Sequence, residues 1–357
     1  GTFEWTGDGL VSTTGQSVDI TGLTVGSYDY TVTITDANGC TNTAETTVVV
    51  NDTPIVVIDA TTPVCEGEEI TLTASGTVGT CTWTGDGLDA TTGSTVTASG
   101  LTAGTYTYTV TCVDANGCEG TATVDVVVNP SPIVNIAPVD AICEYEDATL
   151  VANGPAGTYE WSGDGLVSTT GQTVTVSDLT AGTYDYTVTM TDANGCTSTE
   201  STTLTVNPTP SVSIEPVDAV CIGSDITLLA NGSVGTYEWS GNGLNATTGQ
   251  TVTASTTGFT AGTYTYTVTL TDNNGCTNTA SVDVQVDTNP DVVIEAVAPI
   301  CQGTGFDLSA TSIAGGTYNW SGIGITGTGQ TVSVSAGLAA GIYDYNVTVT
   351  DANGCSG

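Results

Sequence analysis

The chain has 357 residues and a formal net charge of −38, because it carries 38 acidic residues and no lysine, arginine or histidine. Without basic side chains there is no surface for phosphate, which argues against nucleic acid as a partner. Like charges repel one another and favour a soluble, extended molecule surrounded by counterions. Apolar residues make up 39% of the chain. No run of them approaches the roughly 20 residues that a membrane helix needs, so we expect no membrane insertion in this segment.

The sequence is an internal repeat. Its five tryptophans lie 78, 78, 78 and 81 residues apart, a period typical of domain arrays. Short proline-containing segments separate the copies. We interpret them as linkers, because proline interrupts a strand and stiffens a short connection. These features predict a partial unit over 1–51 that begins at its third strand, complete units over 52–129, 130–207 and 208–287, and a partial unit over 288–357 that lacks most of its last strand.

The best-defined element of each unit is a predicted β-hairpin. In the second unit, residues 105–118 read TYTYTVTCVDANGC, and large apolar side chains alternate with threonines, as in a strand with one buried face. Tyr106, Tyr108 and Val110 share that face. Asn-Gly at 116–117 predicts a type I′ turn, in which both central residues have positive φ, and 121–128 is the returning strand.

The rest of the second unit contains more short predicted strands. We place them at 55–59, 70–74, 81–83 and 95–98, with loops at 61–69 and 101–104. No segment shows helical periodicity. Short strands with turns about every 8–12 residues predict an all-β fold, namely a tandem array of immunoglobulin-like antiparallel β-sandwiches without helices.

Several motifs of the second unit resemble known repeats. Trp83-Thr-Gly-Asp-Gly87, Gly104-Thr-Tyr106 and the DANG sequence at 114–117 are similar to the polycystic-kidney-disease (PKD) repeat, an immunoglobulin-like sandwich. VCEGEEITL at 64–72 and NGC at 116–118 resemble the repeats of Bacteroidota cell-surface adhesins and gliding-motility-associated proteins. The resemblance covers the whole chain and implies an extracellular or cell-surface protein. The last two units depart from it, with GNG at 241–243 and GIG at 322–324 in place of Gly-Asp-Gly.

Two of the 11 cysteines occur only in the second unit. Cys81 and Cys112 stand where the other copies have aromatic or aliphatic residues. Both face inward by the alternation of their strands, and those strands are antiparallel neighbours in an immunoglobulin-like sandwich. Their joint appearance predicts a Cys81–Cys112 disulfide.

The other nine cysteines form two sets. Those of one set lie in the loop before the second strand of a unit, and those of the other directly follow the hairpin turn. Two ways of pairing the sets are open. Pairing within units gives Cys65–Cys118, Cys143–Cys196, Cys221–Cys276 and Cys301–Cys355. Pairing between neighbouring units gives Cys65–Cys196, Cys143–Cys276 and Cys221–Cys355. We favour the second scheme, because the two cysteines of one unit lie at opposite ends of the sandwich, ~20–30 Å apart, whereas a disulfide needs Cα atoms within about 7 Å. Either scheme implies an oxidising, extracellular compartment.

The available side chains argue against an enzyme. Histidine and lysine, which commonly act as general bases or nucleophiles, are absent. The acidic position shared by Asp8, Asp86 and Asp164 becomes Asn242 and Ile323 in the last two units, so we expect no catalytic carboxylate there.

No cofactor is expected, with Ca²⁺ as the one alternative. Its candidate ligands in the second unit are Asp114, Asn116, Glu66 and Glu68, whose oxygen atoms suit a hard cation. A complete calcium-loop signature is missing from the sequence.

We therefore expect a structural protein, a disulfide-stabilised rod of immunoglobulin-like repeats that forms an extracellular filament or the stalk of an adhesin. Its partners would be neighbouring copies of the same repeat, including self-assembly into filaments. Two alternatives are a carbohydrate- or partner-binding array and a spacer of a large secreted hydrolase. A sugar-binding array would use Trp83, Tyr106 and Tyr108 as a stacking platform, but their shared face predicts that they belong to the core.

Overall fold

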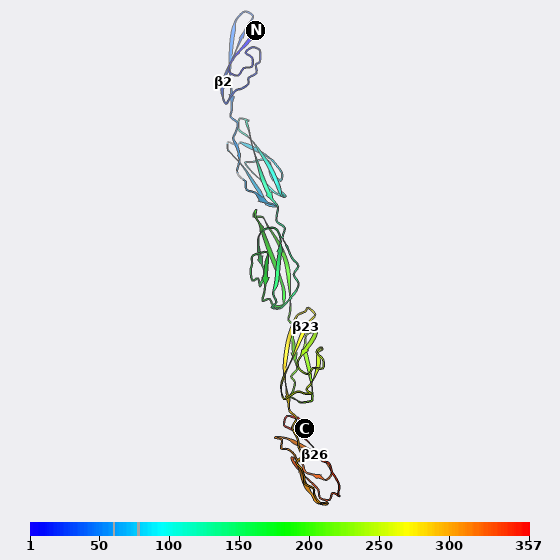
Figure 1. The fold of residues 1–357 in the computed structure, drawn as a ribbon. Coiled ribbons are helices and arrows are strands. Elements are labelled where there is room, and N and C mark those ends of the chain that lie inside the picture. The colour runs from blue at the N-terminus through cyan, green and yellow to red at the C-terminus, as the bar shows by residue number, and fades with distance from the viewer. Residues whose placement is uncertain (60, 77–78) are drawn as a thin grey trace.

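A computed structural model describes residues 1–59, 61–76 and 79–357. Within these ranges the chain forms β-strands and no helix, and accordingly no helix there could cross a bilayer. The units follow one another end to end as an elongated rod (Figure 1). The predicted array of immunoglobulin-like sandwiches is thus confirmed over the described part of the chain.

The third unit shows the sandwich in full. One sheet has the strand order β11–β13–β15 and the other the order β12–β17–β16–β14. The first sheet contains β11 (Asn135–Ile136), β13 (Ala148–Asn153) and β15 (Thr173–Val176). The second contains β12 (Ile142–Cys143), β14 (Gly157–Ser162), β16 (Gly182–Asp192) and β17 (Thr197–Asn207). The hairpin β16–β17 supplies the longest strands of the unit.

The second and fourth units repeat this arrangement. The strands of the second unit are β4 (Val56–Ile58), β5 (Val64–Cys65), β6 (Ile70–Gly76), β7 (Thr80–Thr84), β8 (Thr95–Ala98), β9 (Gly104–Val113) and β10 (Glu119–Asn129). Those of the fourth are β18 (Val212–Ile214), β19 (Val220–Cys221), β20 (Asp225–Gly232), β21 (Gly235–Ser240), β22 (Thr251–Ser255), β23 (Gly262–Asp272) and β24 (Thr277–Asp287).

The units at the two ends of the chain contain fewer strands in the described residues. The first has a single sheet of β1 (Thr2–Thr6), β2 (Gly26–Thr35) and β3 (Thr41–Val50). The last has β25 (Phe306–Ser309), β26 (Thr317–Ser321), β27 (Ile325–Thr326), β28 (Thr331–Val334) and β29 (Asn346–Thr350).

The loop predicted at 61–69 contains a short strand, so the sequence-based prediction was wrong there. β5 pairs in parallel with the end of β10, where Val64 lies opposite Val128 and Cys65 opposite Asn129. Two residues are too few to show an alternation, and a parallel partner far along the chain leaves no local signal. The pairing fixes the loop cysteine beside the last residue of its unit.

Alternation places the same residue types in the core of each unit. In β9, Tyr108, Val110 and Cys112 have no exposed surface, and Trp83 on β7 is 1% exposed. Tyr106 is half-buried against this core, and its hydroxyl donates to the Thr102 carbonyl at 3.0 Å. Of the aromatic residues that a sugar-binding array would have used, Trp83 and Tyr108 are therefore packed inside the sandwich, and Tyr106 is half-buried against them.

A glycine that packs against a core tyrosine explains the Gly-x-Gly turn of each unit. Gly163 has φ of 144°, and a Cβ at this position would lie 2.3 Å from Cδ1 of Tyr186. The Tyr186 hydroxyl donates to the backbone carbonyl of Asp164 at 2.7 Å, and burial raises the pKa of Tyr186 to about 12. Because the acceptor is a backbone carbonyl, the side chain between the glycines is free to vary, as Ile323 shows.

Replacing Gly163 with alanine is expected to destabilise the third unit by about 1–3 kcal/mol, because the new methyl group must displace the Tyr186 ring. Gly182→Ala is the matched control, since its Cβ would meet its nearest neighbour, Cε2 of Tyr184, at 3.5 Å. Hydrogen exchange of the β16 amides measures the change. Equal effects of the two substitutions would contradict the packing argument.

Candidate functional site at the joints between units

Three disulfides connect neighbouring units across their ends. They join Cys65 to Cys196, Cys143 to Cys276 and Cys221 to Cys355, with Cα–Cα distances of 5.6, 5.6 and 5.5 Å. Each bond links the loop cysteine of one unit to the hairpin cysteine of the next. The structure thus has the between-unit pairing. The within-unit scheme, with Cys65–Cys118, Cys143–Cys196, Cys221–Cys276 and Cys301–Cys355, is wrong for this structure, in which Cys118 and Cys301 carry free thiols.

Strand topology explains this pairing. We call the end of a unit at which its first strand begins the upstream pole, and the end at which its last strand finishes the downstream pole. Cys143 lies at the downstream pole, because β12 pairs with the final residues of β17 and Cys143 lies opposite Asn207. Cys196 directly precedes β17 and lies at the upstream pole, a strand length away. The downstream pole of one unit meets the upstream pole of the next, which brings loop and hairpin cysteines together.

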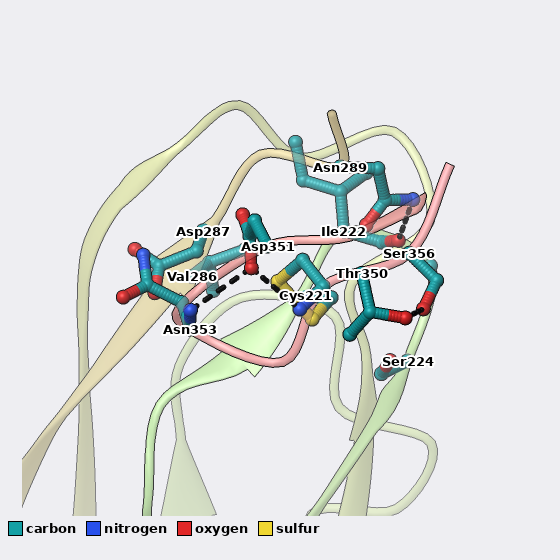
Figure 2. The surroundings of a disulfide bond; sticks show 12 residues. Cys221, Ile222, Ser224, Val286, Asp287, Asn289, Thr350, Asp351, Asn353 and Ser356 are labelled. Carbon is teal, nitrogen blue, oxygen red and sulfur yellow. Dashed lines mark hydrogen bonds between the residues drawn. A yellow bond between two sulfur atoms is a disulfide. The ribbon is translucent and has the colours of Figure 1, made fainter. Parts of the chain in front are cut away.

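The hairpin turn orients its cysteine toward the neighbouring unit. At the joint between the fourth and fifth units, the Asp351 carboxylate accepts hydrogen bonds from the backbone N–H groups of Asn353 and Cys355 at 2.9 and 2.8 Å (Figure 2). The Gly354 amide donates to the Asp351 carbonyl at 3.2 Å, and Gly354 has φ of 85°. Asp351 thereby fixes the backbone at the cysteine that bonds to Cys221.

This turn geometry corrects the predicted type I′ turn. Gly117 has positive φ, 82°, whereas Asn116 is not among the non-glycine residues with positive φ. The Asp114 amide donates to the Cys118 carbonyl at 3.0 Å, which closes a three-residue loop of the kind that combines a type I turn with a left-handed glycine. Asp114 selects this turn, because its carboxylate accepts from the amides of Asn116 and Cys118, both at 2.8 Å.

A glutamate next to the loop cysteine ties the downstream pole to the linker. The Glu144 carboxylate accepts from the Ala181 amide at 2.9 Å and from the amide and hydroxyl of Thr209, both at 3.0 Å. These hydrogen bonds hold the pKa of Glu144 below its ordinary value, and the bond from the Thr209 amide contributes most to the lowering. In the second unit Glu66 accepts from the amides of Ala103 and Ser131 at 2.7 and 3.2 Å, which likewise lowers its pKa.

The fourth unit replaces this glutamate with a different set of contacts. Ile222 stands at the glutamate position, and the Asn289 side chain of the linker donates to the Ile222 carbonyl at 3.2 Å. Thr256, fully buried, accepts from the Gly223 amide and donates to the Ser224 carbonyl, both at 2.8 Å. Neither arrangement was predicted from the sequence. The signal for the first was an acidic residue directly after the loop cysteine in the second and third units.

The calcium candidates do not converge on one place. Asp114 and Asn116 lie at the upstream pole of the second unit, and Glu66 and Glu68 at the downstream pole. Glu68 accepts from the Cys65 amide at 2.8 Å, so the three carboxylates all hold backbone N–H groups. In the described ranges no three acidic, histidine or cysteine residues are grouped as metal ligands. Calcium binding by these residues remains an untested prediction.

The cysteine pair found only in the second unit lies inside its sandwich. Cys81 on β7 is directly opposite Cys112 on β9, and the two form a disulfide with a Cα–Cα distance of 4.0 Å. The corresponding residues in the third unit, Tyr159 and Met190, are also directly opposite each other and buried. The disulfide therefore occupies a slot that the other units fill with apolar side chains.

The fold and the joints define the chain as a tandem array of immunoglobulin-like domains bridged by disulfides across their ends. Residues 131–210 match the family described as "Ig-like domain CHU_C associated", and residues 215–286 match a family described as a PKD domain. The immunoglobulin-like and PKD-like character is thereby confirmed for the third and fourth units. These are domain types without catalytic machinery of their own.

One relative and two solved structures are also similar. The dyslexia-associated protein KIAA0319-like protein of Mus musculus is 25% identical over 303 residues, which cover 71% of this chain and 29% of the relative. The eight N-terminal immunoglobulin domains of Down syndrome cell adhesion molecule are 14% identical, with a TM-score of 0.27 and coverage of 97% of this chain and 62% of that one. The human desmocollin-1 ectodomain is 11% identical, with a TM-score of 0.24 and coverage of 100% and 90%.

Glu144→Gln is expected to loosen the joint between the third and fourth units at neutral pH, because glutamine lacks the charge that strengthens its hydrogen bonds. The folded-state pKa of Glu144 is lowered, so its contribution is complete above the unfolded-state pKa, roughly 4.3, and is lost as pH falls through the folded-state pKa. Acid should therefore loosen the wild-type joint and leave the variant unchanged. Hydrogen exchange of the Ala181 and Thr209 amides, corrected for intrinsic rates, should be several-fold faster in the variant at neutral pH.

Glu160→Gln is the control for this experiment, because Glu160 is exposed on β14 away from the joint. The joint after the fourth unit, where Ile222 replaces the glutamate, provides an internal reference in the same sample. Equal acid sensitivity of the wild type and Glu144→Gln at these amides would contradict the assigned role.

The oxidised chain is expected to carry three thiols, those of Cys40, Cys118 and Cys301. Maleimide labelling without reductant, followed by intact-mass measurement, should add three labels to the denatured chain. In the native chain the exposed Cys40 and Cys301 should react faster than the half-buried Cys118. Trypsin has no site, so cleavage at acidic residues should release the linked peptides. A peptide joining Cys143 to Cys196 would overturn the between-unit pairing.

Proposed function

We propose that this chain is a structural segment of an extracellular protein, a stiff rod that forms the stalk of an adhesin or part of a surface filament. The observation that carries the proposal is that neighbouring units from the second to the fifth are connected twice, by the peptide linker and by a disulfide. A single linker would let each unit swivel. Two separate attachments restrict both bending and rotation.

Other features of the joints support the same role. Glu66 and Glu144 fasten the linker to the pole from which it emerges. The net charge of −38, without any compensating basic side chain, disfavours folding of the rod back on itself. The number of disulfides fits an oxidising, extracellular setting. The resemblance of the cysteine-containing motifs to Bacteroidota surface adhesins and gliding-motility-associated proteins fits this setting as well.

Small-angle X-ray scattering of the oxidised chain tests the proposal. We expect a rod with a maximum dimension of about 200 Å, at roughly 40 Å per unit for strands of 11–12 residues. Cys143→Ser with Cys276→Ser removes the central staple and should introduce a hinge, which lowers the average end-to-end distance. Sedimentation at rising concentration distinguishes the adhesin stalk from the filament subunit, since a filament subunit should assemble and a stalk should stay monomeric.

A flexible or folded-back oxidised chain, or an oxidised chain and a double variant with the same scattering, would overturn the proposal. Electron microscopy of the same samples provides an independent measurement of the hinge angle.

A further inference from the structure

We infer that the between-unit disulfides enable this rod to carry tension along its length, because they create two continuous covalent paths along it. Most strands of each sandwich lie outside these paths and are not pulled. The inference rests on the proposed role as a rod and gives that role a mechanism. This mechanism follows from the order of strands, linkers and disulfides along the rod, and it does not depend on any single cysteine.

The second, third and fourth units are each crossed by two separate covalent segments, one near the beginning of the unit and one near its end. In the third unit, the segment from the linker to Cys143 passes along β11 and β12 from the upstream pole to the downstream pole. The segment from Cys196 to the next linker passes along β17 in the same direction. We call these the first-strand and last-strand segments.

The disulfides join these segments alternately. A last-strand segment runs through the peptide linker into the first-strand segment of the next unit. That first-strand segment ends at a loop cysteine, whose disulfide leads into the last-strand segment of the unit after it. The rod therefore contains two continuous paths, each of which alternates between the two kinds of segment.

Both paths can be followed residue by residue. Path one comprises residues 40–65, the Cys65–Cys196 disulfide, residues 196–221 and the Cys221–Cys355 disulfide. Path two comprises residues 118–143, the Cys143–Cys276 disulfide and residues 276–301. The three free thiols are the ends of these paths, since path one begins at Cys40 and path two runs from Cys118 to Cys301.

The backbone segments of the paths have little slack. Each of 40–65, 118–143, 196–221 and 276–301 contains 26 residues and crosses the last strand of one unit and the first of the next. Fully extended, 26 residues span about 86–94 Å. Two units at roughly 40 Å each span about 80 Å. The segments are therefore close to their full length in the folded rod.

The remaining strands of each unit lie outside both paths. In the third unit, residues 144–195 contain β13, β14, β15 and β16 with most of the core, including Trp161 and Tyr186. Tension between the two ends of the rod reaches these strands only if a disulfide opens. A pulled domain array without such bonds would release the residues of a whole unit each time one unfolded.

Force spectroscopy with handles at the two termini tests this inference. In the oxidised chain the terminal units are joined by residues 40–65 and 196–221 and the two disulfides of path one. Only residues 1–39, which precede the path, should unfold. Because Gly1 lies close to the turn before Cys40 in the folded unit, the gain in contour length should be roughly 120–130 Å. With the disulfides reduced, further steps of roughly 240 Å should appear as units of about 78 residues unfold.

Two variants that each remove one between-unit disulfide form a matched pair. Cys143→Ser with Cys276→Ser interrupts path two and leaves path one intact between the handles, so it should show no new unfolding step. Cys65→Ser with Cys196→Ser interrupts path one, so the tension must pass through residues 66–117 of the second unit and, beyond Cys143, through strands that path one bypasses. New steps should appear in this variant alone, although each loses a single bond of the same kind.

The inference is overturned if the oxidised wild-type chain releases whole units, or if the two variants show the same number of steps. Its failure is distinguishable from failure of the proposed rod. A chain that bends freely in scattering but shows no unit-sized steps under force would keep the covalent paths and refute the stiff rod. Unit-sized steps in an oxidised chain that scatters as a rod would do the reverse.

Discussion

The architecture depends on the separation of two cysteines to opposite poles of each sandwich. Parallel pairing of a two-residue strand with the end of the last strand fixes the loop cysteine at the downstream pole. An aspartate-capped turn fixes the hairpin cysteine at the upstream pole. A disulfide cannot span the length of a sandwich, so each cysteine is available only to a neighbouring unit. The end-to-end disulfides and the two covalent paths follow from this one constraint, and the proposed stiffness of the rod depends on it.

A chain without positive side chains must satisfy its carboxylates in other ways. At the joints Glu66, Glu144 and the turn aspartates accept backbone N–H groups. Along the hairpins one aspartate lies directly opposite one threonine and accepts its hydroxyl at 2.6–2.7 Å, and the acid alternates between the two strands from unit to unit. The pairs are Asp29–Thr47, Thr107–Asp125, Asp185–Thr203 and Thr265–Asp283. Two acids opposite each other would repel, and no pair has them.

The sequence predicted what depends on local pattern and missed what depends on distant partners. Alternation in the hairpin identified Tyr108 and Val110 as core residues, and the joint appearance of Cys81 and Cys112 on facing strands identified their bond. The turn type was missed, because the choice between two glycine-containing turns depends on how the aspartate carboxylate caps the loop. The role of Glu144 was missed because its hydrogen-bond donors lie on Ala181 and Thr209, which are remote in sequence.

The sequence by itself determined the repeat, the sandwich of each unit and the number of possible cysteine pairings, because periodicity and strand alternation are properties of neighbouring residues. Only the tertiary structure decided which pairing exists. That decision depends on where the poles of successive sandwiches lie, and a linker of a few residues brings a downstream pole against the next upstream pole. The covalent paths could not be predicted from the sequence alone, because they depend on which cysteines pair, and the tertiary structure decides that pairing.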